Sequence, residues 1–191
     1  MTLLRVVVIL LLATGGGFMT AACGRQAPAP PPPAPVAEPI ASVAPGGFGV
    51  TERAFVDLSV ATDDQAVKLL DLGAARAASP ALRTFATSLA AARRTELGEL
   101  RGMLAAESVT YVNQHEGHDM PGMPTESELT DLAAATDFDA MFVQLTLAHL
   151  SESATVAESA ANQVTHPATK DIATRMATER AASLVRLNGL S

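Results

Sequence analysis

The segment Phe55-Val-Asp-Leu-Ser-Val-Ala61 returns 87 residues later as Phe142-Val-Gln-Leu-Thr-Leu-Ala148. The register continues without a gap, because Pro80 falls on Pro167 at the same offset. Matches between Ala residues are expected by chance in an Ala-rich chain, but matches of Phe and Pro at one offset are not. We therefore infer an internal duplication, with one copy over about residues 51–104 and the other over about 138–191.

Each copy is predicted to form two α-helices. From Thr51, the expected N-cap of the first helix, apolar side chains recur at steps of three and four residues up to the turn at Ser79. Ser79 is the expected N-cap and Pro80 the first residue of the second helix, which continues to about Leu104. The second copy repeats this pattern over about residues 136–164 and 167–190. Between the copies, Thr125-Glu-Ser-Glu128 predicts the start of a short helix.

These helices predict the fold. Two helical hairpins that each expose one apolar face bury those faces against each other. We expect residues 49–191 to form an all-α, ferritin-like four-helix bundle, built from two repeated helical hairpins with a short helix between them. Phe55 and Phe142 should be buried at equivalent places in the two copies.

Composition and charge exclude several classes of function. The chain has 191 residues, and its 13 Lys and Arg against 20 Asp and Glu give a formal net charge of −7, so it lacks the basic surface that nucleic-acid binding needs. A single Cys excludes an intramolecular disulfide framework. No nucleophile–base constellation, phosphate loop or paired carboxylate site is apparent. We therefore expect neither an enzyme nor a catalytic residue.

The first 22 residues have the features of an export signal, with Arg5 before a short apolar run and then small residues. The run is shorter than the about 20 residues of a membrane-spanning helix. Thr20-Ala-Ala-Cys23 resembles the bacterial lipoprotein signal, in which the Cys becomes the lipid-modified first residue, although Thr20 replaces the preferred Leu. The chain is thus expected in the cell envelope, outside the cytoplasm, anchored to a membrane by lipid at Cys23. The alternative is an ordinary secretory signal with an incidental Cys.

A Pro-rich segment, residues 23–48, follows the signal and has Gln26-Ala-Pro-Ala-Pro-Pro-Pro-Pro-Ala-Pro35 at its centre. Such a composition cannot pack a core and favours extended polyproline II structure. We expect a linker that starts with the lipidated Cys and lifts the helical domain off the membrane. A disordered spacer without a role in binding is compatible with the same task.

The loop between the two copies, residues 106–124, contains His115-Glu-Gly-His118-Asp-Met120-Pro-Gly-Met123. Imidazole and thioether groups together suit copper, and thioethers favour Cu(I). The alternative is a solvated linker whose side chains bind nothing. The expected metal ligands of this loop are His115, His118, Met120 and Met123.

His149 lies seven residues after Phe142 and therefore on the buried face of the same helix. An inward-facing His in a bundle is a potential metal ligand or proton carrier. The alternative is a core His held by a hydrogen bond. A di-iron carboxylate site would need matching ligands from the first copy, where Thr62 and Gln65 stand opposite His149 and Glu152. Ferroxidase or oxygenase chemistry is therefore not expected.

The segments Gly117-His-Asp-Met-Pro-Gly-Met123, Phe138-Asp-x-Met-Phe142 and Leu145-x-x-x-His149 resemble the domain-of-unknown-function family 305. The resemblance covers residues 51–190 and includes the duplication. It implies a small ferritin-like helical bundle of a kind common among exported bacterial lipoproteins. The family includes copper-tolerance proteins of the CopM type, which implies a metal-binding role.

The chain resembles a degenerate member of this family. The usual His-His pair is His149-Leu150 in the second copy and Thr62-Asp63 in the first. The usual Gln-x-x-Glu-x-x-x-Met is Arg93-x-x-Glu96-x-x-x-Leu100 in the first copy and Arg180-x-x-Ser183-x-x-x-Leu187 in the second. Of a metal site inside the bundle, only His149 and Glu96 are thus expected to remain, beside the loop.

Two hypotheses of function follow. The first is an exported, lipid-anchored, metal-binding protein that sequesters or hands over copper through the loop and His149, without bond-breaking chemistry. The second is a non-enzymatic interaction module that binds another envelope protein and has lost its ancestral metal site.

Overall fold

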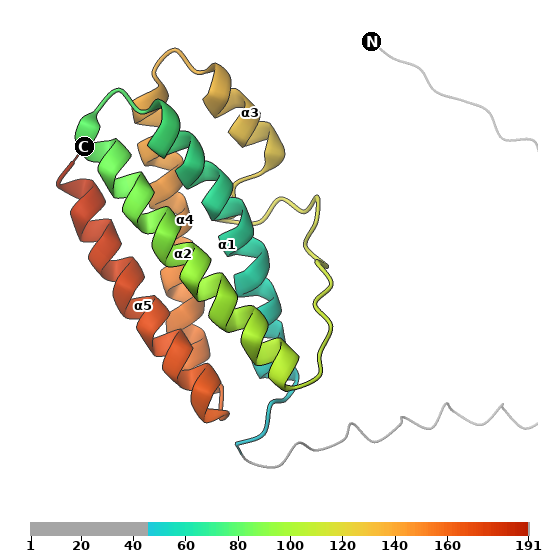
Figure 1. The fold of residues 1–191 in the computed structure, drawn as a ribbon. Helices are drawn as coiled ribbons and strands as arrows, with labels where there is room; N and C mark the ends of the chain where they lie inside the picture. The colour runs from blue at the N-terminus through green and yellow to red at the C-terminus, as the bar shows by residue number, and fades with distance from the viewer. Residues whose placement is uncertain (1–45, 191) are drawn as a thin grey trace, which may run out of the picture. The chain divides into compact units, whose positions relative to one another are not determined.

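The computed structural model describes residues 46–190, which contain five α-helices and no strand. Cys23 and the export signal lie outside the described residues. The all-helical fold and the short helix between the two hairpins are as predicted (Figure 1). The helices are α1 (Val50–Arg76), α2 (Pro80–Ala106), α3 (Glu126–Ala134), α4 (Phe138–Gln163) and α5 (Pro167–Asn188).

The helix starts follow their capping side chains. The predicted caps at Ser79 and Thr125 are both present. α1 begins after Gly49, because the Glu52 carboxylate accepts the Gly49 N–H at 3.1 Å and the helix starts one residue before the predicted cap. α4 begins after Asp137, two residues later than predicted, because this carboxylate accepts an N–H of the first turn.

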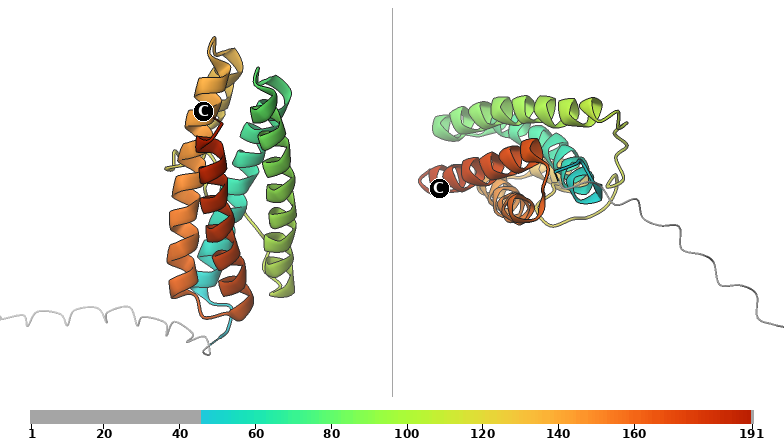
Figure 2. Two further views of the ribbon diagram at one scale, coloured as in Figure 1. Left: turned by 90° about the vertical axis from the view of Figure 1, so that its left-hand side faces the viewer. Right: turned by 90° about the horizontal axis from the view of Figure 1, so that it is seen from below.

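The helices form two hairpins that meet through their first members (Figures 1 and 2). α1 packs on α2, α4 packs on α5, and the main contact between the hairpins is that of α1 with α4. α3 lies against α4 and α1. The connection 107–125 runs along the bundle from the end of α2 to α3, which brings the predicted copper loop alongside the helices (Figure 1).

Two acidic side chains join the hairpins in the same way at opposite ends of the bundle. The Glu52 carboxylate of α1 accepts the N–H of Thr165, at 2.9 Å, in the turn between α4 and α5. The Asp139 carboxylate of α4 accepts the N–H groups of Ala78 and Ser79, both at 2.8 Å, in the turn between α1 and α2. Each of these contacts maps onto the other by the 87-residue offset, so the duplication is visible in the tertiary hydrogen bonds.

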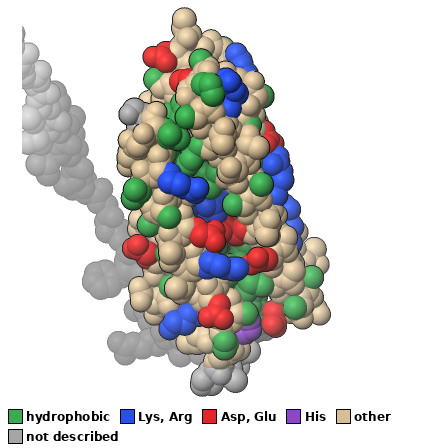
Figure 3. Space-filling view, turned by 60° about the vertical axis from the view of Figure 1, so that its left-hand side comes forward, with side chains coloured by type: hydrophobic (Ala, Val, Ile, Leu, Met, Phe, Trp, Pro, Cys, Tyr) green, Lys and Arg blue, Asp and Glu red, His purple; other side chains and the backbone are tan. Residues whose placement is uncertain are grey.

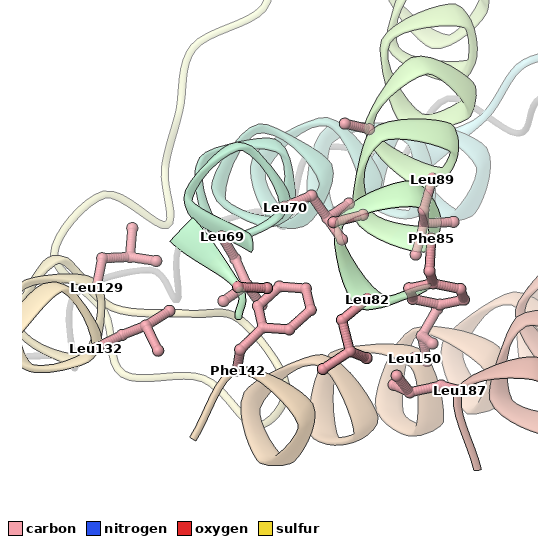
Figure 4. Packing of buried hydrophobic residues seen from close by; sticks show 13 residues of the cluster. Leu69, Leu70, Leu82, Phe85, Leu89, Leu129, Leu132, Phe142, Leu150 and Leu187 are labelled. Carbon is pink, nitrogen blue, oxygen red and sulfur yellow. The ribbon is translucent and has the colours of Figure 1, made fainter. Parts of the chain in front are cut away.

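The apolar core has two parts, one towards each end of the bundle. Both predicted Phe residues are buried, Phe55 in one part and Phe142 in the other, which confirms their assignment to the core. Figure 4 shows the part around Phe142. Its large members are Leu69, Leu70, Leu82, Phe85, Leu89, Leu129, Leu132, Phe142, Leu150 and Leu187, whereas the other part includes Phe55, Val56, Val60, Leu97, Leu100, Leu104, Ile172 and Met176.

Gly73 of α1 makes room for Phe142 of α4. A Cβ atom at residue 73 would lie 2.3 Å from Cε2 of the Phe142 ring, which no real contact allows. The close approach of α1 and α4 therefore depends on the absence of a side chain at this position.

A layer of polar side chains separates the two apolar parts on all four long helices. We call it the polar layer, and its members are almost fully buried. In α1 and α2 it divides the residues of one apolar part from those of the other. It consists of Asp63 of α1, Arg93 and Glu96 of α2, His149 of α4 and Arg180 of α5.

Candidate metal site

The loop is held against α4 through Gly122. The N–H of Met123 donates to the carbonyl of Met120 at 3.0 Å and closes a tight turn. Gly122 in this turn has a φ of 72°, in the left-handed region that favours glycine. A Cβ atom at residue 122 would lie 2.5 Å from Cβ of Glu152 and 3.0 Å from the carbonyl oxygen of Ala148. Only glycine therefore lets the loop backbone approach α4 this closely.

His149 of α4 forms a hydrogen bond with the loop. Its Nδ1 lies 3.1 Å from the carbonyl oxygen of Gly122. Because a carbonyl oxygen only accepts, Nδ1 carries the proton and Nε2 carries the lone pair. The side chain is 1% exposed, and Nε2 has no hydrogen-bond partner among the described residues. A buried imidazole whose Nδ1–H is held by a backbone carbonyl and whose Nε2 is free is prepared for metal ligation.

The His149 imidazole stays neutral over a wide pH range. Burial, and after it the nearby cations Arg180 and Arg93, together lower the pKa of His149 to about 3, although the hydrogen bond to the Gly122 carbonyl acts in the opposite direction. His149 was predicted to face inward, and its burial confirms this. The hydrogen bond of Nδ1 fits the alternative of a core His. That alternative does not explain why the buried Nε2 has no hydrogen-bond partner among the described residues.

A cavity of about 180 Å³ lies beside His149, between α1, α4, α5 and the loop. Met120 of the loop lines it, as do Met176 of α5 and Ser59 and Thr62 of α1. Arg180 and Glu152 also contribute to its wall. The soft ligand groups of this cavity are thus one imidazole and two thioethers, which come from three segments distant in sequence.

The predicted ligands of the loop do not form a single group. His115 and His118 lie side by side, with ring centroids 6.5 Å apart, on the outer part of the loop. Met120 lines the cavity beside His149. Met123 is 6% exposed and lines a neighbouring hollow together with Glu128 and Leu145. The structure therefore separates an outer His pair from an inner place that includes Met120 and His149.

Glu96, the other residue expected to remain from a bundle site, is engaged in ion pairs. Its carboxylate accepts from Arg93 at 2.9 Å and from Arg180 at 2.6 and 3.1 Å. Arg180 also pairs with Asp63 at 3.1 Å. Both carboxylate oxygens of Glu96 are therefore engaged by guanidinium groups, which removes this residue from the candidate metal ligands.

The pKa values of the two carboxyl groups of the polar layer shift in opposite directions. Burial raises the pKa of Asp63 well above its usual range. Glu96 is buried too, which raises its pKa, but hydrogen bonds from Asp63 and Arg180 lower it below its usual range overall. Two guanidinium groups thus surround the Glu96 carboxylate in the polar layer, next to His149.

Sequence reasoning missed this ion-pair network, although a signal was present. Arg93 and Arg180 occupy equivalent positions of the two copies and lie on the apolar faces of α2 and α5. A repeated Arg on a core-facing position requires a buried partner, and Glu96 lies one turn from the first of them. The network approaches the surface between α2 and α5, where acidic and basic side chains gather in Figure 3.

Within residues 46–190, no group of three or more His, Cys, Asp or Glu side chains could hold a metal ion. No helix of this part of the chain is long and apolar enough to cross a membrane.

Solved structures share the fold. A DUF305 fragment from Deinococcus radiodurans is 16% identical with a TM-score of 0.65, covering 74% of this chain and 95% of that one. A DUF305 protein from Streptomyces coelicolor is 19% identical with a TM-score of 0.68, covering 75% and 93%. CopM in the Cu(II)-bound form is 16% identical with a TM-score of 0.66, covering 73% and 94%.

No curated protein sequence matches this chain significantly. The profile of the family described as "Domain of unknown function (DUF305)" matches residues 52–191, which is nearly the whole helical domain. The chain therefore belongs to the DUF305 family.

Proposed function

We propose that this protein binds copper in the cell envelope and acts in sequestration or handover, without bond-breaking chemistry. The observation that carries the proposal is the state of His149. Its Nδ1–H is held by the Gly122 carbonyl, its buried Nε2 has no hydrogen-bond partner among the described residues, and its side chain lines the same cavity as Met120. Imidazole nitrogen and thioether sulfur are ligands that suit copper.

Two places on the molecule fit the predicted ligands. His118 is exposed, His115 is half-buried and their rings are adjacent, so the pair suits a first contact with copper from solution. Met120 and His149 lie further inside, where bound copper would be shielded from exchange. The side chain of Met123 is buried and helps to hold the loop in place. The loop would have to rearrange before Met123 could bind copper. The Cu(II)-bound form of CopM adds support by family relation.

The test is copper stoichiometry and affinity of the purified protein, measured by anaerobic competition with a Cu(I) chelator. We expect about one Cu(I), bound at least about tenfold more weakly after His149→Ala. His166→Asn is the matched control, because it removes an imidazole but keeps a side chain that caps α5. A wild-type protein that binds no copper would refute the proposal.

The docked loop offers a second, sharper test. Gly117 and Gly122 have nearly the same φ, 74° and 72°, so Ala costs the same backbone strain at both. Only at residue 122 does the new Cβ meet another atom, since nothing lies within 4 Å at residue 117. Gly122→Ala should therefore weaken Cu(I) binding as His149→Ala does, whereas Gly117→Ala should not. Equal effects of the two substitutions would contradict the role of the docked loop.

Export and lipid anchoring at Cys23 are part of the proposal. The basic residue, short apolar run and small residues before Cys23 support it. Cys23→Ala should move the protein from the membrane fraction to the soluble exported pool. Unchanged membrane association of this variant would refute the anchor.

One observation favours the alternative of a non-enzymatic interaction module that binds an envelope protein. Arg93 and Arg180 stand where the family pattern has Gln, and they fill the centre of the bundle with ion pairs to the retained Glu96. Copper-free wild-type protein after the same anaerobic competition would support this alternative.

A further inference from the structure

The cavity beside His149 contains one potential ligand that the sequence motifs do not include. Met176 of α5 is 2% exposed, and it lies in the chain 27 residues beyond His149 and far from the loop. It lines the same cavity of about 180 Å³ as His149 and Met120. The repeat pairs Met176 with Leu89, so an apolar side chain without sulfur fills the equivalent position in the first copy.

We propose that Met176 completes an inner copper site, with the His149 Nε2 and the sulfur atoms of Met120 and Met176 as ligands of a monovalent ion, Cu(I). This inference rests on the copper-binding function proposed above. It adds a ligand from α5, so that the bound ion would tie the loop, α4 and α5 together.

The chemistry of the cavity favours a soft monovalent ion. Its three ligand groups are neutral, and thioethers prefer Cu(I) to harder ions. His149 needs no proton release to bind, because its Nε2 is already unprotonated. The free Nε2 is buried and unpartnered, which is the independent observation that a ligand group is expected there.

The charge around the cavity disfavours a divalent ion. Arg180 lines the wall, and its guanidinium is shared with Glu96 and Asp63. Glu152, also on the wall, is an exposed carboxylate, so solvent screens its attraction for a cation more than it screens the repulsion by the buried Arg180. A fixed guanidinium repels a divalent ion twice as strongly as a monovalent one at the same distance. Cu(I) should thus bind in preference to Zn(II) at this site.

The experiment compares Met176→Leu with Met141→Leu in the full chain carrying His115→Ala and His118→Ala, so that only the inner place remains. Met141 is a half-buried methionine of α4 that packs on the apolar part around Phe142 and does not line the cavity. Exchange of Met for Leu keeps the side-chain volume and its apolar character, so both variants should fold. Circular dichroism checks the fold before copper is added.

Two readouts are used: the Cu(I) affinity by anaerobic chelator competition, and the number of sulfur neighbours by X-ray absorption at the copper edge. We expect two sulfur neighbours in the parent protein and one after Met176→Leu, with an affinity at least about tenfold lower. Met141→Leu should change neither. Ag(I), a soft monovalent probe, should compete for the site, and Zn(II) should not.

The outcomes separate the two proposals. If His149→Ala and Met120→Leu weaken Cu(I) binding but Met176→Leu leaves the affinity and the sulfur count unchanged, the Met176 ligand is wrong and the proposed function stands. Displacement of Cu(I) by Zn(II) would overturn the preference for a monovalent ion. A wild-type chain that binds no Cu(I) would overturn the proposed function itself, and the inner site with it.

Discussion

Replacement of Glu96 by Gln tests the polar layer, because this carboxylate holds both buried guanidinium groups. Glu96 accepts two hydrogen bonds from Arg93 and two from Arg180, at distances of 2.6 to 3.1 Å. The side chains of both arginines are at most 1% exposed, and that of Glu96 is 8% exposed. Gln keeps the size of the side chain but removes the charge, and its NH₂ group faces donors.

The expected loss of stability follows from this geometry. Breaking a buried ion pair by removing one partner costs about 3–5 kcal/mol, because an uncompensated charge stays behind. Asp63 remains 3.1 Å from Arg180 and still offers this guanidinium a carboxyl partner, which recovers part of the cost. We therefore expect a loss near the lower end, about 3 kcal/mol. In a protein of this length that lowers the midpoint of thermal unfolding by about 6–12 °C.

Glu99→Gln is the matched control. Glu99 lies on the same helix, three residues further, and pairs with Arg175 on α5. Both partners are about half exposed, so this pair should contribute less than about 1 kcal/mol. Urea unfolding of both variants, followed by circular dichroism at 222 nm, measures the difference. A loss for Glu96→Gln within 1 kcal/mol of that for Glu99→Gln would refute the reasoning.

Three further predictions concern the core and its acid sensitivity. Gly73→Ala should destabilise the fold by up to about 2 kcal/mol, because overpacking against Phe142 outweighs the helix propensity of Ala. Gly98→Ala is the control and should stabilise the fold by about 0.5–1 kcal/mol, because a Cβ atom there meets nothing within 4 Å. Unfolding free energies that change in the same direction in both variants would contradict this packing. Phe142→Ala should cost about 3–5 kcal/mol in urea unfolding, and a loss below 1 kcal/mol would argue against its place in the core. The pKa of His149 is 6.5 in the unfolded chain and about 3 in the folded one, so the unfolded state binds the proton first and stability falls as the pH decreases from about 6.5 to 3. His149→Leu should remove about 3 kcal/mol of this loss between pH 7 and pH 4 in copper-free protein, and an unchanged pH dependence of the unfolding free energy would show that the imidazole is not held neutral.

The fold could be predicted because the signals that determine it are local or repeated. The three- and four-residue spacing of apolar side chains, together with the cap at Ser79 and the proline at residue 80, defined the second helix. The positions of Phe55 and Phe142 in two copies predicted two equivalent hairpins, and both side chains are buried. The helix starts at Val50 and Phe138 were misplaced by one or two residues, because the side chains of Glu52 and Asp137 decide them.

The candidate site could be predicted only in part. The inward position of His149 followed from helical periodicity, and its burial confirms it. The free Nε2 did not follow, since it depends on a carbonyl 27 residues away in the loop. Met176 could not be connected with the loop either, because nothing in its own helix distinguishes it from another apolar core residue.

The sequence by itself determined the helices, their pairing into two hairpins and the types of ligand that the chain can offer. These properties depend on side chains a few residues apart or on a repeat, and both are visible in the sequence alone. Only the tertiary structure decided which ligands meet. Gly122 lets the loop approach α4, and the Nδ1–H of His149 then donates a hydrogen bond to the Gly122 carbonyl. Arg93, Glu96 and Arg180 form ion pairs with one another at the centre of the bundle. The physical reason is that a lone pair is free or engaged according to its neighbours in space, and those neighbours come from segments that only the packed helices bring together.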